Sequence, residues 1–347
     1  MTLFLLRLLS CLLIISSLLP LVKLDYWWIR VFDYPRVQKL TIVILILLGW
    51  VYLDYGSSNL EPWIWIGSLG LCASFLIIKI FPFTVLGKKM IETVPFDENN
   101  GIQILVSNVY QYNTKFEKLT SLIDEVKPDL IFLVETDQRW EKGISSIENS
   151  YPNTIKLPQD NTYGLLLYTN LEIVNQEIHH WIDDEIPSLE LDIRLRNGKI
   201  ITIYAIHPTP PVPGENEKST DRDAEILLVG KKAKANNNPT MVIGDLNDVA
   251  WSYTTELFLK NSELVDPRRG RGLFNTFHAK IPLMRWPLDH VFLSEEFGLA
   301  DIRVQKAIGS DHFPISLNAV LCADKVTEIK KANEKEKKEA REKISRA

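Results

Sequence analysis

The sequence predicts an α/β domain with two packed sheets, preceded by an all-helical region that crosses a membrane. Three features of its 347 residues predict this arrangement. Residues 1–90 contain three long apolar runs. In residues 91–323, short strand-forming runs outnumber helical segments, and helices lie between some of them. Residues 324–347 are rich in Lys and Glu with almost no apolar face, so we expect a solvated helix or a disordered tail there.

The charge of the chain is unevenly distributed. The formal net charge is −5, but residues 91–323 carry 22 Lys and Arg against 34 Asp and Glu, a net charge of −12. An acidic domain is unlike a protein that binds nucleic acid through its phosphate backbone. A cation site, in contrast, requires carboxylates. The three cysteines show no spacing typical of a disulfide framework or a zinc site.

The three apolar runs are Leu3–Val22, Leu40–Leu53 and Trp63–Val85. A membrane span needs roughly 20 residues, which the first and third runs supply and the second approaches with its flanks. The first run is alternatively a signal peptide with Arg7 at its positive end, but no small-residue cleavage pattern follows it. We therefore predict three membrane helices, with the lipid bilayer as a partner of the chain.

The positions of the basic residues predict the orientation of these helices. The first connection and the segment after the third run are basic, whereas residues 54–61 contain no Lys or Arg. The positive-inside rule places the first connection and the C-terminal domain in the cytoplasm, with the N-terminus outside. The basic residues concerned are Lys23, Arg30, Arg36, Lys39, Lys88 and Lys89.

The first two predicted strands of the soluble region each end in a polar residue. Gly101–Val109 has Asn108 near its end, and Leu130–Val134 is followed directly by Glu135. Between them, Thr114–Val126 has the apolar spacing of a helix. A crossover helix favours parallel or neighbouring strands, so both polar residues should lie at one edge of a sheet.

A β-hairpin is predicted by the Asn-Gly pair at 197–198, between Ser188–Arg196 and Lys199–Ile206. Its second arm ends at His207. The other predicted elements are strands over Tyr163–Tyr168, Met241–Gly244, Leu288–Leu293, Ile302–Lys306 and Ile315–Val320, and helices over Thr220–Ala235 and Tyr253–Lys260.

Asp245 and Asn247 follow the strand that ends at Gly244. Because side chains alternate along a strand, these two should point the same way. A carboxylate beside an amide suits a site for a phosphate and a hard cation. The plainer interpretation is an Asx-rich turn.

Eight polar residues lie at the ends of apolar runs or in the adjoining turn. Each has an ordinary explanation alone, such as a turn-forming Asn or a capped His. Ionisable groups gathered at strand ends, however, are where α/β enzymes build active sites. The eight residues are Asn108, Glu135, His207, Asp245, Asn247, Asp289, Asp311 and His312.

The order of these motifs resembles the endonuclease/exonuclease/phosphatase superfamily, which includes DNase I-like nucleases, bacterial neutral sphingomyelinases and inositol-polyphosphate 5-phosphatases. The resemblance covers about residues 101–320 and rests on Asn108 and His207 together with four short motifs. It implies a four-layer α/β sandwich that hydrolyses phosphate esters. The motifs are VET at 134–136, GDLN at 244–247, LDHVF at 288–292 and SDH at 310–312.

The resemblance also implies a cofactor, Mg²⁺ or alternatively Mn²⁺. Glu135 and Asn108 would hold the ion, and Asp311 would complete the metal or phosphate environment. A hard cation with oxygen ligands neutralises charge on the phosphate during hydrolysis.

The remaining residues receive catalytic roles from the same resemblance. His312 is the general base that deprotonates the attacking water, and Asp289 orients it. Asp245 and Asn247 position the phosphate or the water. His207 hydrogen-bonds the phosphate or assists the leaving group.

Residues next to these motifs are less specific. We expect Arg268, Arg269 and Arg271 to be surface charges, with Arg269 and Arg271 as candidates to bind the substrate phosphate. His290 should pack on the opposite face of its strand from Asp289.

The sequence supports a reaction better than a substrate. Nucleic acid, a lipid head group and a soluble phosphate ester all remain possible, and the membrane anchor with the acidic domain favours the lipid. The alternative function is a catalytically silent, membrane-tethered binding scaffold. The presence of all eight polar residues argues against that alternative, because a scaffold has no chemical need for them.

Overall fold

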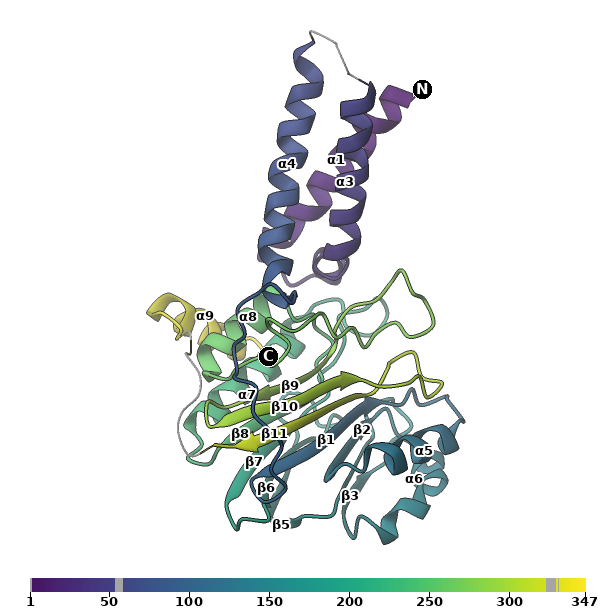
Figure 1. Cartoon of the computed structure of the whole chain (residues 1–347), viewed down its shortest axis with the longest axis vertical. Coiled ribbons are helices and arrows are strands. Elements are labelled where there is room, and N and C mark those ends of the chain that lie inside the picture. The colour runs from purple at the N-terminus through teal and green to yellow at the C-terminus, as the bar shows by residue number, and fades with distance from the viewer. Residues whose placement is uncertain (1, 54–58, 323–328, 330) are drawn as a thin grey trace.

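The computed structural model describes residues 2–53, 59–322, 329 and 331–347. It shows a bundle of long helices standing on a two-sheet sandwich (Figure 1). The bundle contains α1 (Thr2–Leu18), α3 (Arg36–Leu53) and α4 (Leu60–Ile80). Their contact faces bury apolar side chains, whereas Leu and Ile side chains on the outside remain exposed. The helices are long and apolar enough to cross a membrane over Leu3–Leu21, Arg36–Leu53 and Leu60–Phe83.

The described strands form two mixed sheets. The six-stranded sheet has the order β10-β11-β1-β2-β4-β3, and the five-stranded sheet has the order β5-β6-β7-β8-β9. The first sheet comprises β1 (Gly101–Asn108), β2 (Leu130–Val134), β3 (Asn153–Leu157), β4 (Leu165–Thr169), β10 (Phe297–Val304) and β11 (Ile315–Leu321). The second comprises β5 (Glu172–His179), β6 (Ser188–Arg194), β7 (Ile200–Ala205), β8 (Thr240–Asp245) and β9 (Asp289–Leu293).

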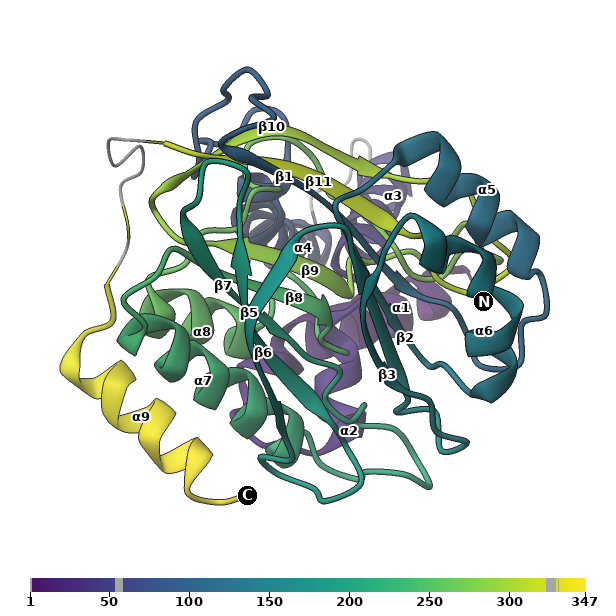
Figure 2. The same ribbon diagram turned by 90° about the horizontal axis from the view of Figure 1, so that it is seen from below.

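The inner faces of the two sheets pack together, and helices cover their outer faces (Figure 2). The outer face of the six-stranded sheet packs on α5 (Phe116–Val126) and α6 (Gln138–Gly143). The five-stranded sheet packs on α7 (Thr220–Ala235) and α8 (Tyr253–Ser262). This helix–sheet–sheet–helix order confirms the predicted four-layer sandwich.

Strand register brings the predicted polar residues to one edge of the sandwich. β1 and β2 are parallel, joined by α5, and Asn108 pairs with Val134, the residue before Glu135. In the other sheet β8 and β9 are antiparallel, with Asp245 directly opposite Asp289. The carboxyl ends of β1, β2, β7 and β8 therefore meet where the two sheets face each other.

Among the described strands, three differ from the sequence prediction. β3 and β5 were not predicted; β5 is an exposed edge strand whose residues are mostly polar, so it lacks a clear apolar alternation. β10 begins at Phe297 rather than Ile302 because it continues past a bulge to pair with β11.

The C-terminal tail is helical, as one of the two expectations had it, but it packs on the sandwich instead of being fully solvated. Residues 334–344 form α9 (Glu334–Ile344), which Asn333 and Glu336 begin with a reciprocal capping box. Ala340 is buried against the α7–α8 layer, and the Lys343 Nζ donates to the Asp223 carboxylate (3.0 Å). The expectation also covered residues 324–328 and 330, which lie outside the described part of the chain.

The bundle packs directly on the sandwich through the connection between α1 and α3. The Trp251 indole donates to the Asp33 carbonyl (2.8 Å), and the Tyr34 hydroxyl donates to the Asn247 carbonyl (2.7 Å). Phe83, in the short 3-10 helix that follows α4, meets Trp251 edge-on. The first connection thus lies on the same side of the bundle as the sandwich (Figure 1).

Candidate active site

A single amide links the two sheets at the polar edge. The Asn108 Nδ2 donates to Glu135 Oε1 (2.7 Å) and to Asp245 Oδ2 (3.0 Å). The close approach of β8 to the residue after β7 depends on Gly244, because a Cβ there would lie 1.9 Å from the Ile206 carbonyl oxygen. Its φ of 143° is also unfavourable for a residue with a side chain. The glycine of the GDLN motif is therefore required by the backbone rather than by chemistry.

His312 lies between two buried carboxylates. Its Nδ1 donates to Asp289 Oδ2 (2.8 Å), and its Nε2 lies 3.5 Å from Asp245 Oδ2. Burial alone would lower the pKa of His312, but Asp289 and Asp245 outweigh it and raise the pKa to about 10. Burial raises the pKa of Asp289, whereas His312 and His207 lower that of Asp245 in spite of its burial. This arrangement fixes the imidazole and directs its Nε2 toward the centre of the cluster.

His207 is a second buried imidazole, just after β7. Burial lowers its pKa, although the nearby Asp245 opposes that shift. The Tyr163 ring lies beside it, with centroids 5.5 Å apart. Its Nδ1 has no hydrogen-bond partner among the described residues. A buried, unpaired ring nitrogen is unusual, and it leaves His207 available to an oxygen of a bound molecule.

Glu135 is a partly buried carboxylate, and it has no cationic side chain at ion-pair distance in the described parts of the chain. Burial raises its pKa to about 7, although the bond from Asn108 opposes the rise. Such a carboxylate fits a hard divalent cation, which would supply the missing positive charge. Asp311, half-buried, accepts a bond from the Ser310 hydroxyl (3.3 Å) and forms no ion pair within the described residues. The oxygen donors at this edge therefore suit a metal such as Mg²⁺.

Asp245, Asp289 and His312 also have ligand atoms within 4.8 Å of one another, close enough to hold a metal ion. Without an ion, His312 contacts both carboxylates directly, so the three side chains already form a hydrogen-bonded and ion-paired group.

The backbone of Asn247 is held by groups that sequence reasoning missed. Its carbonyl accepts bonds from the Tyr34 hydroxyl and the Arg222 guanidinium, both 2.7 Å. Its amide Nδ2 donates to the Pro208 carbonyl (3.0 Å), and its own N–H donates to Asp245 (3.0 Å). Arg222 lies in α7, and Tyr34 lies in the connection between α1 and α3, so no local motif could have identified either residue.

These residues match a known family over most of the sandwich. The model described as Endonuclease/Exonuclease/phosphatase family matches residues 105–312. The chain belongs to this family. Its members are hydrolases that act on phosphate esters, and the chain is assigned to that enzyme class. No curated protein sequence matches the chain.

Solved structures share the fold at low sequence identity. Humanized D. rerio TDP2 is 14% identical, with a TM-score of 0.52; the match covers 63% of this chain and 99% of that chain. The endonuclease/exonuclease/phosphatase from Beutenbergia cavernae is 15% identical (TM-score 0.52; 64% and 72% covered). The human nocturnin catalytic domain with bound sulfate is 13% identical (TM-score 0.52; 65% and 96% covered).

Three arginines near the family motifs do not reach the site. Arg269 pairs with Glu256 and lies over the Phe83 ring, and Arg271 donates to the Ile91 carbonyl (2.7 Å). The structure therefore does not bring these two substrate-binding candidates to the cluster.

Arg268 and Arg269 were expected on the surface but are buried. Arg268 pairs with Asp266 (2.7 Å) and contacts His290. His290 lies on the opposite face of β9 from the site, as predicted, and its Nε2 contacts the Asp248 carbonyl oxygen (2.8 Å). These arginines form ion pairs and hydrogen bonds away from the candidate site instead of lining it.

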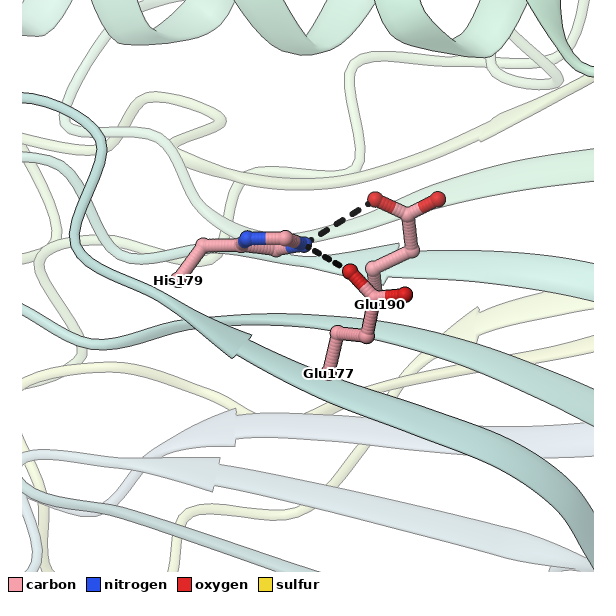
Figure 3. Close-up of side chains that lie close together, drawn as sticks. All are labelled: Glu177, His179 and Glu190. Atoms are coloured by element: carbon pink, nitrogen blue, oxygen red, sulfur yellow. Dashed lines mark hydrogen bonds and ion pairs between the residues drawn. The ribbon is translucent and has the colours of Figure 1, made fainter.

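A second group that could hold a metal lies on β5 and β6 (Figure 3). His179 Nε2 is 3.1 Å from Glu190 Oε2 and 3.4 Å from Glu177 Oε2. The Lys232 Nζ lies 3.6 Å from the same Glu190 oxygen, so one carboxylate already has a cation beside it. We therefore interpret this group as a partly solvated ion-pair cluster.

Proposed function

We propose that this chain is a membrane-anchored, Mg²⁺-dependent phosphodiesterase in which His312 activates the attacking water. The observation that carries the proposal is the continuous set of contacts from Glu135 through Asn108 and Asp245 to His312 and Asp289. It joins a carboxylate suited to a cation to a histidine suited to proton transfer, across the two sheets.

Glu135, with Asn108 and Asp311, would hold Mg²⁺, or Mn²⁺ in its place, and the ion would stabilise negative charge on the phosphate. The Nε2 of His312 would take the proton of the attacking water while Asp289 holds the Nδ1–H. The high pKa of His312 reflects the uncompensated carboxylates around it, so charge compensation at this edge would bring it toward the range of a general base.

The opposite side of the phosphate would be held by residues of the five-stranded sheet. Asn247 follows β8 and is fixed by Tyr34 and Arg222, so its position in the site is rigid. The unpaired Nδ1 of His207 would contact a phosphate oxygen or the leaving oxygen. Tyr163 packs beside that ring and limits its movement.

We further propose that the three apolar helices span a membrane with the sandwich in the cytoplasm. The first connection, which holds Lys23 and Arg30, packs on the sandwich, so both belong on one side, as the basic residues predict. The helix α1 packs within the bundle, since the Trp50 indole donates to the Ser10 hydroxyl (3.0 Å). That contact favours a retained helix over a cleaved signal peptide. A C-terminal reporter active only outside the cell would reverse the orientation.

The test of the enzymatic proposal uses the full chain in lipid nanodiscs with Mg²⁺ or Mn²⁺. The substrates are plasmid DNA, single-stranded DNA, phospholipids and bis-p-nitrophenyl phosphate. We expect hydrolysis of at least one diester, its loss on chelation, and its loss in E135A and H312A. H312A should still bind the metal, because His312 is not among its expected ligands. Unchanged hydrolysis in either variant would reject the mechanism.

A further inference from the structure

The loop before β9, residues 278–286, presents an apolar tip to the surface. Its sequence is His-Ala-Lys-Ile-Pro-Leu-Met-Arg-Trp, so the four residues of the tip lie between Lys280 and Arg285. A short apolar tip between two cations is typical of segments at a membrane interface, where the cations reach the head groups. The exposed fractions of its large side chains are 42% for Ile281, 82% for Leu283 and 47% for Met284.

This tip lies beside the first turn of a candidate membrane helix. The Gln38 Nε2 donates to the Leu283 carbonyl (3.0 Å) and to the Arg285 carbonyl (3.3 Å). Gln38 is the third residue of the apolar span Arg36–Leu53. Because a span begins at the bilayer interface, the carbonyls that Gln38 holds must lie close to the same level. The loop is therefore continuous with the surface that the bundle would present to lipid.

The base of the same loop contacts the catalytic cluster. The Phe277 ring lies 4.9 Å from the His312 ring, and the Ala279 N–H donates to the Asp311 carbonyl (2.6 Å). At the other end of the loop, Trp286 is buried in an apolar cluster, and Tyr34 from the connection between α1 and α3 packs against that cluster. One short loop thus joins the proposed general base to the foot of the bundle.

We propose that loop 278–286 inserts its apolar tip into the bilayer interface, and that the site accepts the phosphodiester head group of a lipid in that bilayer. The inference rests on the proposed function, which supplies both the membrane spans and the reaction. A lipid phosphate lies at the level of Lys280 and Arg285, where cations are attracted to anionic head groups. The lipid then reaches the site without its acyl chains entering water. A nucleic acid or a soluble ester would gain nothing from an exposed Leu283.

The first test compares lipid and soluble substrates with the full chain in nanodiscs. The discs contain phosphatidylcholine, phosphatidylglycerol and sphingomyelin, and the soluble diester is bis-p-nitrophenyl phosphate. In the double variant L283S/M284S we expect lipid hydrolysis to fall about tenfold, because two apolar anchors are lost. Hydrolysis of the soluble diester should stay within about twofold, since neither side chain belongs to the cluster. The matched control V174S removes an exposed apolar side chain from edge strand β5 and should change neither rate.

The second test measures the depth of the tip without using activity. In a C11S/C72S/C322S background, L283C and V174C are each labelled with the fluorophore NBD and reconstituted into discs containing doxyl-labelled lipid. We expect strong quenching at position 283 and none above background at position 174.

Four outcomes overturn the inference while leaving the proposed function intact. They are absence of quenching at position 283, hydrolysis of the soluble diester without any lipid hydrolysis, a preference for DNA, and equal loss on both substrates in L283S/M284S. If the unmodified chain hydrolyses no diester at all, whether lipid, soluble diester or DNA, the proposed function itself fails.

Discussion

The described part of the chain contains two clusters in which one histidine faces two carboxylates, and they differ in burial. At the strand ends His312 lies between Asp289 and Asp245, and all three side chains are buried. On β5 and β6 the corresponding residues remain partly exposed and have Lys232 beside them. The chemical groups are alike, so their different surroundings must determine what each cluster does.

Burial is the difference that matters. In the strand-end cluster, water cannot screen the charges, so the pKa of His312 rises to about 10 and that of nearby Glu135 to about 7. In the exposed cluster, water and Lys232 compensate the charges at little cost. A histidine between two carboxylates is therefore a candidate catalyst only where the fold removes water and leaves part of the charge unmatched.

The largest effect should separate the two clusters by activity. Glu135→Gln removes the carboxylate proposed to hold the metal, so we expect diester hydrolysis to fall roughly 10³-fold. Glu177→Gln, the matched change in the exposed cluster, should leave the rate unchanged. Steady-state hydrolysis of bis-p-nitrophenyl phosphate measures both. Equal rates in the two variants would remove the functional distinction between the clusters.

A second prediction extends the comparison to a buried carboxyl outside both clusters. Glu225 accepts a bond from the Ser188 hydroxyl (2.5 Å), and burial raises its pKa to about 7. Because the folded pKa exceeds the unfolded value of 4.5, the stability contributed by Glu225 is complete below pH 4.5 and is lost as pH rises through about 7. Glu225→Gln should therefore raise the free energy of unfolding by about 3 kcal/mol at pH 8 and change it little at pH 4.

Urea unfolding followed by tryptophan fluorescence, in detergent at the two pH values, measures this difference. Glu177→Gln serves as the exposed control and should show no such pH dependence. A gain in E225Q that is the same at both pH values would show that charge burial is not its cause.

A third prediction concerns the orientation of His312. Asp289→Asn preserves the shape of the side chain but removes the charge that holds the imidazole. We expect kcat to fall about 10²-fold. Binding of Mn²⁺, followed by electron paramagnetic resonance, should be retained because Asp289 is not an expected ligand. Loss of metal binding would instead place Asp289 in the cation site.

The smallest effect should come from the exposed cluster. His179→Ala removes the shared partner of Glu177 and Glu190, and we expect the free energy of unfolding to change by less than about 1 kcal/mol. Activity should be unchanged. Bound Zn²⁺, measured by calorimetry in the unmodified chain and absent in H179A, would show that this cluster is a metal site rather than an ion-pair cluster.

The residue types of the strand-end cluster were predictable because each adjoins an apolar run. Asn108, Glu135 and Asp245 lie at the ends of strands, and Asp289 begins one. Arg268, Arg269 and Arg271 show the limit of this reasoning, because charge alone cannot tell a phosphate ligand from a buried ion pair. The edge strand β5 was missed for a related reason: an exposed strand has no apolar face to predict it.

By itself, the sequence determined the three apolar helices, most of the strands and the order of the catalytic motifs, because these depend on spacing along the chain. Only the tertiary structure decided which segments meet. It places Asn108 between Glu135 and Asp245, and it brings Tyr34 and Arg222 to the carbonyl of Asn247. It also places loop 278–286 beside α3. Such contacts join residues up to 247 positions apart. The local periodicity of a sequence specifies the buried face of each helix or strand and where it ends. The register of the strands, the burial of charged groups and the contacts between distant segments arise from packing.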